Sequence, residues 1–187
     1  MSDDTPDWSR IPAPADDGAA AHLDGLAIPP VPLPATDGMV VDLSRLPGRA
    51  VVYAYPRTGR PGVDNPDGWD MIPGARGCTP QSCAFRDHFA DLRALGVDHL
   101  FGLSAQDTAD QREAADRLHL PFPLLSDVDG ALAAALRLPT MTVDGVTLLR
   151  RLTLVIEGGA ILRVFYPVFP PDRSASDVLD WLSNPPS

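Results

Sequence analysis

Apolar, strand-like runs alternate with helix-like segments along most of this chain, and that order restricts the fold more than any other feature. Strands are expected at 50–55, 99–104, 152–157 and 161–166. Helices are expected at 78–95, 108–117, 128–138 and 174–182, and either Ser174 or Ser176 is expected to cap the last of them. Alternating strands and helices predict βαβ units, and Gly158-Gly159 between the last two strands predicts an antiparallel hairpin. We therefore expect an α/β fold in which a central mixed β-sheet is flanked by helices.

The chain has 187 residues, which is enough for one domain with a sizeable core. Residues 1–38 are rich in Pro, Asp, Ala and Gly and show no sustained period, so we expect a partly mobile N-terminal extension before a domain at 39–187. Residues 57–77 are dense in Gly, Pro and Asp, which predicts a long loop. Unstructured loops of this length are uncommon in compact domains and are often functional.

The charge of the chain restricts its partners and its location. A formal net charge of −10 and a pI of about 4.6 argue against binding to nucleic acid or to an anionic membrane surface. No apolar segment approaches the roughly 20 residues that cross a bilayer. The acidic start, Met1-Ser2-Asp3-Asp4, has no apolar run behind it and so does not resemble a secretory signal. We expect a cytoplasmic protein, and in a reducing cytosol a close cysteine pair is more often catalytic, redox-sensing or metal-binding than a permanent disulfide.

The only two cysteines are Cys78 and Cys83, and they lie where a helix is expected to begin. Thr79 can cap this helix, and Pro80 suits its first position. A cysteine at a helix N-terminus faces free backbone N–H groups and the positive end of the helix dipole, both of which favour the reactive thiolate. Residues five apart on an intact helix have Cα atoms about 8–9 Å apart, whereas a disulfide tolerates at most about 7 Å. A bond between the two sulfurs therefore requires the first turn to unwind.

Several segments match a known family in the expected order across residues 39–182. They are Tyr53-Ala54-Tyr55-Pro56, Gly77-Cys78-Thr79, Cys83-Ala84-Phe85-Arg86-Asp87, Leu103-Ser104, Leu120–Asp127 and Arg151–Ile156. On these segments the chain resembles the peroxiredoxins, most closely the Q-type or bacterioferritin-comigratory-protein group. The resemblance implies a thioredoxin-like fold and a peroxidase that reduces hydrogen peroxide or alkyl hydroperoxides.

The same resemblance assigns roles to three residues. Cys78 would be the peroxidatic cysteine, Cys83 the resolving cysteine that forms an intramolecular disulfide, and Arg151 the arginine that holds thiolate and peroxide. Thioredoxin or a similar thiol reductant would complete the cycle without a cofactor, in a monomer or a homodimer. One position departs from the family pattern, because Ala75 stands where a threonine usually contacts the sulfur. In the family, a proline usually precedes that threonine by four residues, whereas Pro56, the apparent match here, is separated from Cys78 by the 57–77 loop. Either Pro73 replaces this proline locally, or the loop folds back and brings Thr58 near the sulfur.

Plainer interpretations exist for most of these residues. Cys83 could pack in the core, which would leave a one-cysteine peroxidase. Successive strand residues point to opposite faces, so only one of Arg150 and Arg151 can face the site, and the resemblance favours Arg151. Trp69 could line a substrate mouth or anchor the loop. The four histidines form no ligand-like cluster with the cysteines, so we expect no metal.

Two other functions compete with the peroxidase. A non-catalytic redox sensor or interaction module would change shape when the cysteine pair is oxidised, and Ala75 would then explain weak turnover. A thioredoxin-like disulfide oxidoreductase would usually carry Cys-x-x-Cys, which is absent from the sequence.

Overall fold

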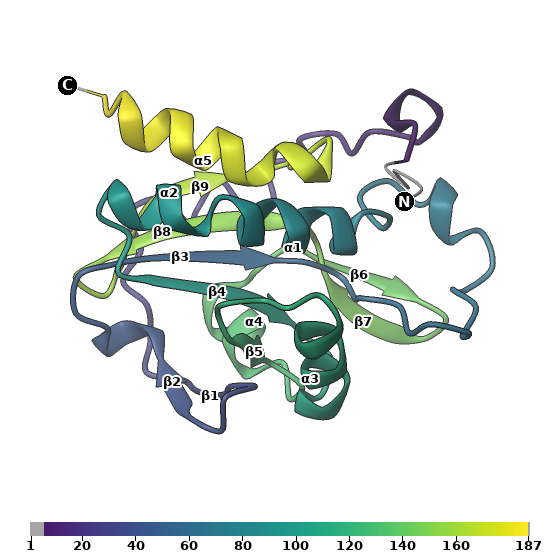
Figure 1. Cartoon of the computed structure of the whole chain (residues 1–187), viewed down its shortest axis with the longest axis horizontal. Coiled ribbons are helices and arrows are strands. Elements are labelled where there is room, and N and C mark those ends of the chain that lie inside the picture. Colours follow the sequence, from purple (N-terminus) through teal and green to yellow (C-terminus); the bar gives the residue numbers. More distant parts are fainter. Residues whose placement is uncertain (1–5, 187) are drawn as a thin grey trace.

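A computed structural model describes residues 6–186 and places a five-stranded mixed sheet between two layers of helices (Figure 1). The strands are, in spatial order, β5 (Leu124–Ser126), β4 (His99–Ser104), β3 (Arg49–Ala54), β8 (Leu152–Glu157) and β9 (Ala160–Phe165). β3, β4 and β5 run parallel, whereas β8 and β9 form an antiparallel hairpin on the other side of β3. The predicted mixed sheet and closing hairpin are confirmed.

The central strand β3 is buried on both faces, so its alternating side chains supply two cores. Tyr53 packs on one face beneath Phe85 and Val178, and Val52 packs on the other against Leu132. The helices over the first face are α1 (Cys78–Asp87), α2 (Phe89–Ala94) and α5 (Ser174–Ser183). The helices over the second face are α3 (Thr108–Arg117) and α4 (Ala131–Leu136) (Figure 1).

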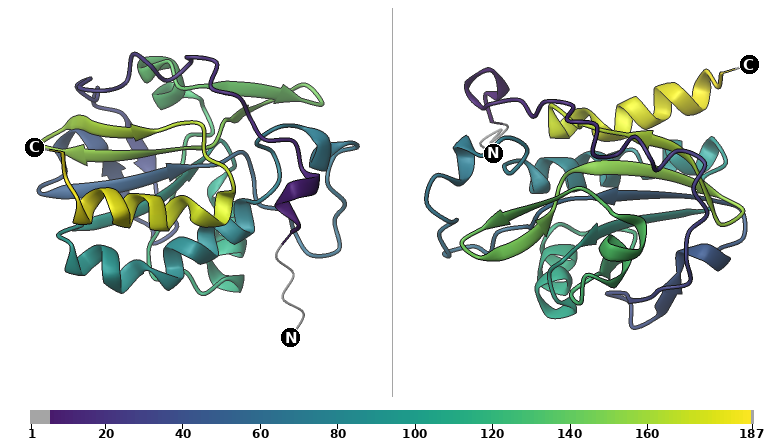
Figure 2. Two further views of the ribbon diagram at one scale, coloured as in Figure 1. Left: turned by 90° about the horizontal axis from the view of Figure 1, so that it is seen from above. Right: turned by 180° about the vertical axis from the view of Figure 1, so that it is seen from behind.

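The N-terminal segment packs against the domain as part of its fold. Leu23, Ile28 and Leu33 are buried in the core on the α4 side of the sheet. The segment also covers both edges of the sheet, since Gly25 and Ile28 bond to the backbone at the β9 hairpin and Thr36 bonds to the backbone of β5 (Figure 2). The expected domain start at residue 39 therefore leaves out core side chains. Residues 1–5 of the expected extension lie outside the described residues.

Helix boundaries differ from the sequence expectations in three places. The helix expected at 78–95 is divided at His88 into α1 and α2. The helix expected at 128–138 is shorter and corresponds to α4 (Ala131–Leu136). Asp127 accepts hydrogen bonds from the N–H groups of Leu132 and Ala133 at the start of this helix. Ser174 and Ser176 were the predicted caps of α5, but neither side chain caps it, because the 3₁₀ turn η4 (Pro171–Arg173) leads directly into the helix.

Five short strands of the described residues have no counterpart among the sequence predictions, namely β5 of the central sheet and four strands outside it. β1 (Pro32–Pro34) pairs with β2 (Val40–Asp42), and β6 (Thr140–Val143) pairs with β7 (Val146–Leu149). Asp144-Gly145 joins β6 and β7, and both residues have positive φ, as a type I′ hairpin turn requires. The remaining 3₁₀ turns are η1 (Trp8–Arg10), η2 (Leu43–Arg45) and η3 (Trp69–Met71).

The described residues lack a membrane-spanning helix and a cluster of metal ligands. Within residues 6–186, none of the helices combines the length and the apolar character needed to cross a membrane. The same residues contain no group of three or more His, Cys, Asp or Glu side chains placed to hold a metal ion.

Replacing Leu23 with alanine tests whether the N-terminal segment belongs to the core. Leu23 is fully buried, so Leu23→Ala should lower the free energy of unfolding by about 2–5 kcal/mol. Leu162→Ala is the control, because Leu162 is 48% exposed on β9 and its loss should change that free energy by about 0.5 kcal/mol or less. Urea unfolding followed by circular dichroism measures both. Equal, small losses in the two variants would contradict the packing of this segment.

Candidate active site

Helix α1 begins at Cys78, directly after a glycine that no other residue can replace without strain. Gly77 has a φ of 112°, and a Cβ there would overlap Pro171 and Trp8. The predicted cap by Thr79 is wrong because Gly77 holds the cap position, which makes Pro80 the third helical residue. The first turn of α1 therefore presents its unpaired N–H groups at Cys78 and favours negative charge there.

Arg151 leads into β8 and reaches the sulfur of Cys78 from beneath the helix start. Arg151 is 3% exposed, and its Nη2 lies 3.3 Å from Cys78 Sγ. The same nitrogen donates to the backbone carbonyls of Gly74, Ala75 and Arg76 at 3.2, 3.2 and 3.3 Å. The buried guanidinium of Arg151 thus binds three carbonyls of the turn before α1 and holds this turn close to the sulfur of Cys78.

Gln81 fixes the other arm of the guanidinium, and the sequence analysis did not identify it. Its side-chain oxygen accepts a hydrogen bond from Arg151 Nη1. Its amide nitrogen donates to Ser174 Oγ at 3.2 Å, and that hydroxyl lies 3.2 Å from Thr153 Oγ1. Gln81 is fully buried, so it connects Arg151 to both α5 and β8. Its position one turn after Cys78 was the available sequence signal.

Cys83 lies in α1 and opens onto the same cavity as Cys78. It is half-buried, and both cysteines are free thiols. Burial raises the pKa of the Cys83 thiol, and the charge of Arg86 opposes part of that rise. The intact helix keeps the sulfurs apart, as the spacing predicts, so the structure describes the reduced arrangement.

Thr58 does not replace the missing threonine at Cys78. Thr58 is buried, but its hydroxyl contacts Gln106 Oε1 at 3.3 Å and makes no hydrogen bond to the sulfur. Pro73, the expected local replacement for the family proline, lines a second cleft together with Arg151, and its role stays a prediction. Ala75 is fully buried, and its carbonyl oxygen lies 3.7 Å from Cys78 Sγ. A backbone carbonyl therefore lies beside the sulfur, and the side chain of Ala75 offers no hydroxyl there.

The 57–77 loop forms the outer wall of the cavity at Cys78. Trp69 is 5% exposed and packs with Ala75 against Met141 and Leu148 of the β6–β7 hairpin. It also lines the cavity, so it anchors the loop and faces the site at once. Arg57, which the sequence analysis did not single out, lines the same cavity.

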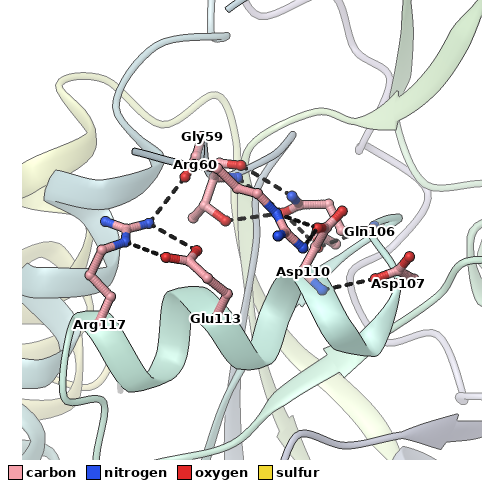
Figure 3. A network of polar contacts seen from close by, with 9 residues as sticks. Gly59, Arg60, Gln106, Asp107, Asp110, Glu113 and Arg117 are labelled. Carbon is pink, nitrogen blue, oxygen red and sulfur yellow. Dashed lines mark hydrogen bonds and ion pairs between the residues drawn. The ribbon is translucent and has the colours of Figure 1, made fainter. Parts of the chain in front are cut away.

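The start of this loop is fastened to α3 and the turn before it (Figure 3). Gln106 exchanges two hydrogen bonds with the backbone of Thr58, at 3.0 and 3.1 Å. Arg117 donates to the carbonyl of Gly59 at 3.0 Å, and Arg60 forms an ion pair with Asp110. The loop therefore has a fixed path where it leaves β3.

The family relationships of the chain agree with this arrangement. The sequence pattern of the redoxin family matches residues 18–180. Peroxiredoxin Q, chloroplastic, of Oryza sativa subsp. japonica is 31% identical over 162 residues, which cover 86% of this chain and 66% of that protein. Peroxiredoxin bcp1 of Schizosaccharomyces pombe is 32% identical over 110 residues, which cover 58% of this chain and 48% of that protein. The chain thus spans less than two thirds of the full length of these curated relatives.

Solved structures of similar fold also come from peroxiredoxins. Peroxidoxin BcpB from Mycobacterium tuberculosis superimposes with a TM-score of 0.70 at 26% identity, covering 89% of this chain and all of that one. Peroxiredoxin Q of Xanthomonas campestris superimposes with a TM-score of 0.67 at 23% identity, covering 87% and 96%. The second match is evidence for the fold alone.

The fold and the site together define a thiol protein of the thioredoxin-like class, with a cysteine at a helix start facing a buried arginine. The chain belongs to the redoxin family, and within it to the peroxiredoxins of the Q type, the group of the bacterioferritin comigratory proteins. The resemblance seen in the sequence is therefore confirmed at the level of family and fold.

Replacing Arg151 with lysine tests whether the guanidinium activates the sulfur. A lysine has one ammonium group and cannot bond Gln81, the preceding turn and the sulfur together. We expect Arg151→Lys to slow oxidation of Cys78 by hydrogen peroxide by about 10²-fold or more, measured by stopped-flow fluorescence. Arg150→Lys is the matched control, because Arg150 donates to the carbonyl of Thr140 away from the sulfur. Equal rates in the two variants would contradict the assignment.

Proposed function

We propose that this protein is a thiol-dependent peroxidase that reduces hydrogen peroxide or an alkyl hydroperoxide through Cys78. The observation that carries the proposal is the contact between Cys78 Sγ and Arg151 Nη2 at 3.3 Å, at the wall of an open cavity. A thiolate needs a nearby cation that stays charged, and a peroxide needs donors for its departing oxygen. The guanidinium and the first N–H groups of α1 supply both.

In the first step, the Cys78 thiolate attacks the terminal oxygen of the peroxide. The S–O bond forms as the O–O bond breaks, the sulfur is oxidised to sulfenic acid, and the other oxygen leaves as water or an alcohol after taking a proton. Arg151 donates to both the sulfur and the peroxide in this account. The hydrogen bond that Arg151 Nη1 donates to the side-chain oxygen of Gln81 keeps the guanidinium aimed at the sulfur.

In the second step, the Cys83 thiolate attacks the sulfur of the sulfenic acid. The disulfide forms and the hydroxyl leaves as water, so the two thiols and one peroxide give a disulfide, water and an alcohol or second water. The first turn of α1 must open for this step, and the hydrogen bond from Gln81 N–H to the Gly77 carbonyl opens with it.

A dithiol such as thioredoxin then reduces the disulfide and restores α1. The cycle uses only sulfur atoms and the peroxide, so we propose that it needs no bound cofactor. It also needs a compartment that keeps such a dithiol reduced, and for that reason we propose the cytoplasm.

Intact mass after one equivalent of hydrogen peroxide tests the two-cysteine cycle. The reduced wild type should lose two hydrogens, because a disulfide forms. Cys83→Ser should stop at an oxygen adduct, and Cys78→Ser should not react. An oxygen adduct in the wild type would mean that Cys83 only packs in the core. A wild type that does not react with peroxide would contradict the peroxidase and favour a non-catalytic role for the pair.

The resolving step should depend on pH in a defined direction. Burial raises the pKa of Cys83, so its thiolate is scarce near neutral pH and grows by up to about tenfold per pH unit below that pKa. We expect disulfide formation to accelerate as pH rises from about 7 to about 8.5, measured by quenched-flow mass spectrometry of the oxygen adduct. A flat profile would contradict attack by Cys83 as a half-buried thiol.

A further inference from the structure

The cavity at Cys78 is far larger than hydrogen peroxide requires. It encloses about 580 Å³, within the range of about 300–1,000 Å³ that small-molecule sites occupy. A water molecule, by comparison, takes about 30 Å³ of liquid volume. The cavity wall combines the ring of Trp69 and the apolar edge of Pro80 with the guanidinium of Arg57 and the amide of Asn65. A hydroperoxide with an organic group therefore fits here, and the wall has polar groups to recognise it.

Among residues 6–186, Arg57 is the charge in this wall that has no anionic partner. Its Nε is buried without a hydrogen bond, and its guanidinium lies 5.8 Å from the centre of the Trp69 ring. The other two arginines of the region are already engaged, because Arg76 Nη1 bonds Asp70 at 2.6 Å and Arg151 bonds Gln81 and the turn before Cys78. Asp70, the acidic group of this wall, is held by Arg76 and does not neutralise Arg57.

The three residues that follow Arg57 are held by contacts with α3 and the turn before it, so the backbone that carries Arg57 has a fixed path. Thr58 forms hydrogen bonds with Gln106, and the carbonyl of Gly59 accepts one from Arg117. Arg60 forms an ion pair with Asp110 (Figure 3). The cation–π contact with the Trp69 ring restricts the guanidinium itself. A preorganised cation loses little conformational entropy when it binds an anion.

From these contacts we infer that Arg57 binds the carboxylate of an organic hydroperoxide whose peroxide group reaches Cys78. The planar guanidinium matches a carboxylate with two parallel hydrogen bonds, and the Trp69 ring covers the carbon chain between them. The carboxylate is unchanged by the reaction, in which the Cys78 thiolate takes the terminal oxygen and the hydroxy acid departs. This inference deepens the proposed peroxidase function and rests on it.

A pair of substrates that differ only in charge tests the role of Arg57. The probes are ω-hydroperoxyoctanoate and its methyl ester, and the measured quantity is the second-order rate constant for oxidation of Cys78 by stopped flow. In the wild type the free acid should react faster than the ester. In Arg57→Gln the ratio of acid to ester should fall by about tenfold or more, because hydrogen bonds to charged groups change binding by that factor.

Two further variants keep this test decisive. Arg57→Lys keeps the positive charge but lacks the two parallel N–H donors of a guanidinium, so it should retain part of the preference for the acid. Arg163→Gln removes the same charge from β9, where Arg163 lies 5.3 Å from the centre of the Phe165 ring and outside the cavity, and should leave the ratio as in the wild type. An equal drop in both glutamine variants would mean that only net charge matters.

The outcomes separate this inference from the proposed function. If hydrogen peroxide and the ester oxidise Cys78 but the acid has no advantage in the wild type, the carboxylate site is wrong and the peroxidase stands. If hydrogen peroxide itself fails to oxidise Cys78, the proposed function is wrong and the inference falls with it.

Discussion

The rest of the site depends on a buried guanidinium that pairs with no carboxylate among residues 6–186. A charge taken out of water costs several kcal/mol unless its surroundings compensate. Arg151 is compensated by the amide oxygen of Gln81, by backbone carbonyls of residues 74–76 and by the sulfur of Cys78. Among these partners only the sulfur can carry a negative charge. The chain therefore places its reactive cysteine where a thiolate completes the solvation of the cation.

The same contacts set the conditions for turnover. Arg151 draws the turn before α1 inward, and the positive φ of Gly77 lets the helix begin at once. Gln81 then ties this first turn to Ser174 of α5. Because Cys83 lies further along the same helix, joining the sulfurs requires that turn to open, and its contacts must be lost for a time. The first turn of α1 is therefore held in place for the attack on peroxide, and the same turn must unwind before the disulfide can form.

Segments from distant parts of the chain surround this helix start. Trp8 donates a hydrogen bond to Asp172 and packs beside Gly77. The 57–77 loop is fastened to α3 at one end and packs through Trp69 on the β6–β7 hairpin at the other. These contacts give the cavity its size, and within the described part of the chain they leave Arg57 without an acidic partner. Our inference of a larger, charged substrate rests on these two features.

The sequence by itself determined the mixed sheet, most of its strands and helices, the position of Cys78 at a helix start and the likeness to the Q-type peroxiredoxins. Those features follow from local periodicity and from motifs, which depend on neighbours in the chain. It did not determine that Leu23 is a core residue, that Thr58 contacts Gln106 in place of the sulfur, or that Gln81 holds Arg151. Asp144-Gly145 was a local hairpin signal that the sequence analysis left unused.

Only the tertiary structure decided the remaining features, and the physical reason is the same for each. Leu23 lies in a Pro- and Asp-rich segment without a period, and it is buried because that segment crosses the sheet. The partners of Arg151 and the isolation of Arg57 depend on which groups approach from residues far away in the chain. Burial and hydrogen bonding across such separations are properties of the packed molecule, so no local pattern encodes them.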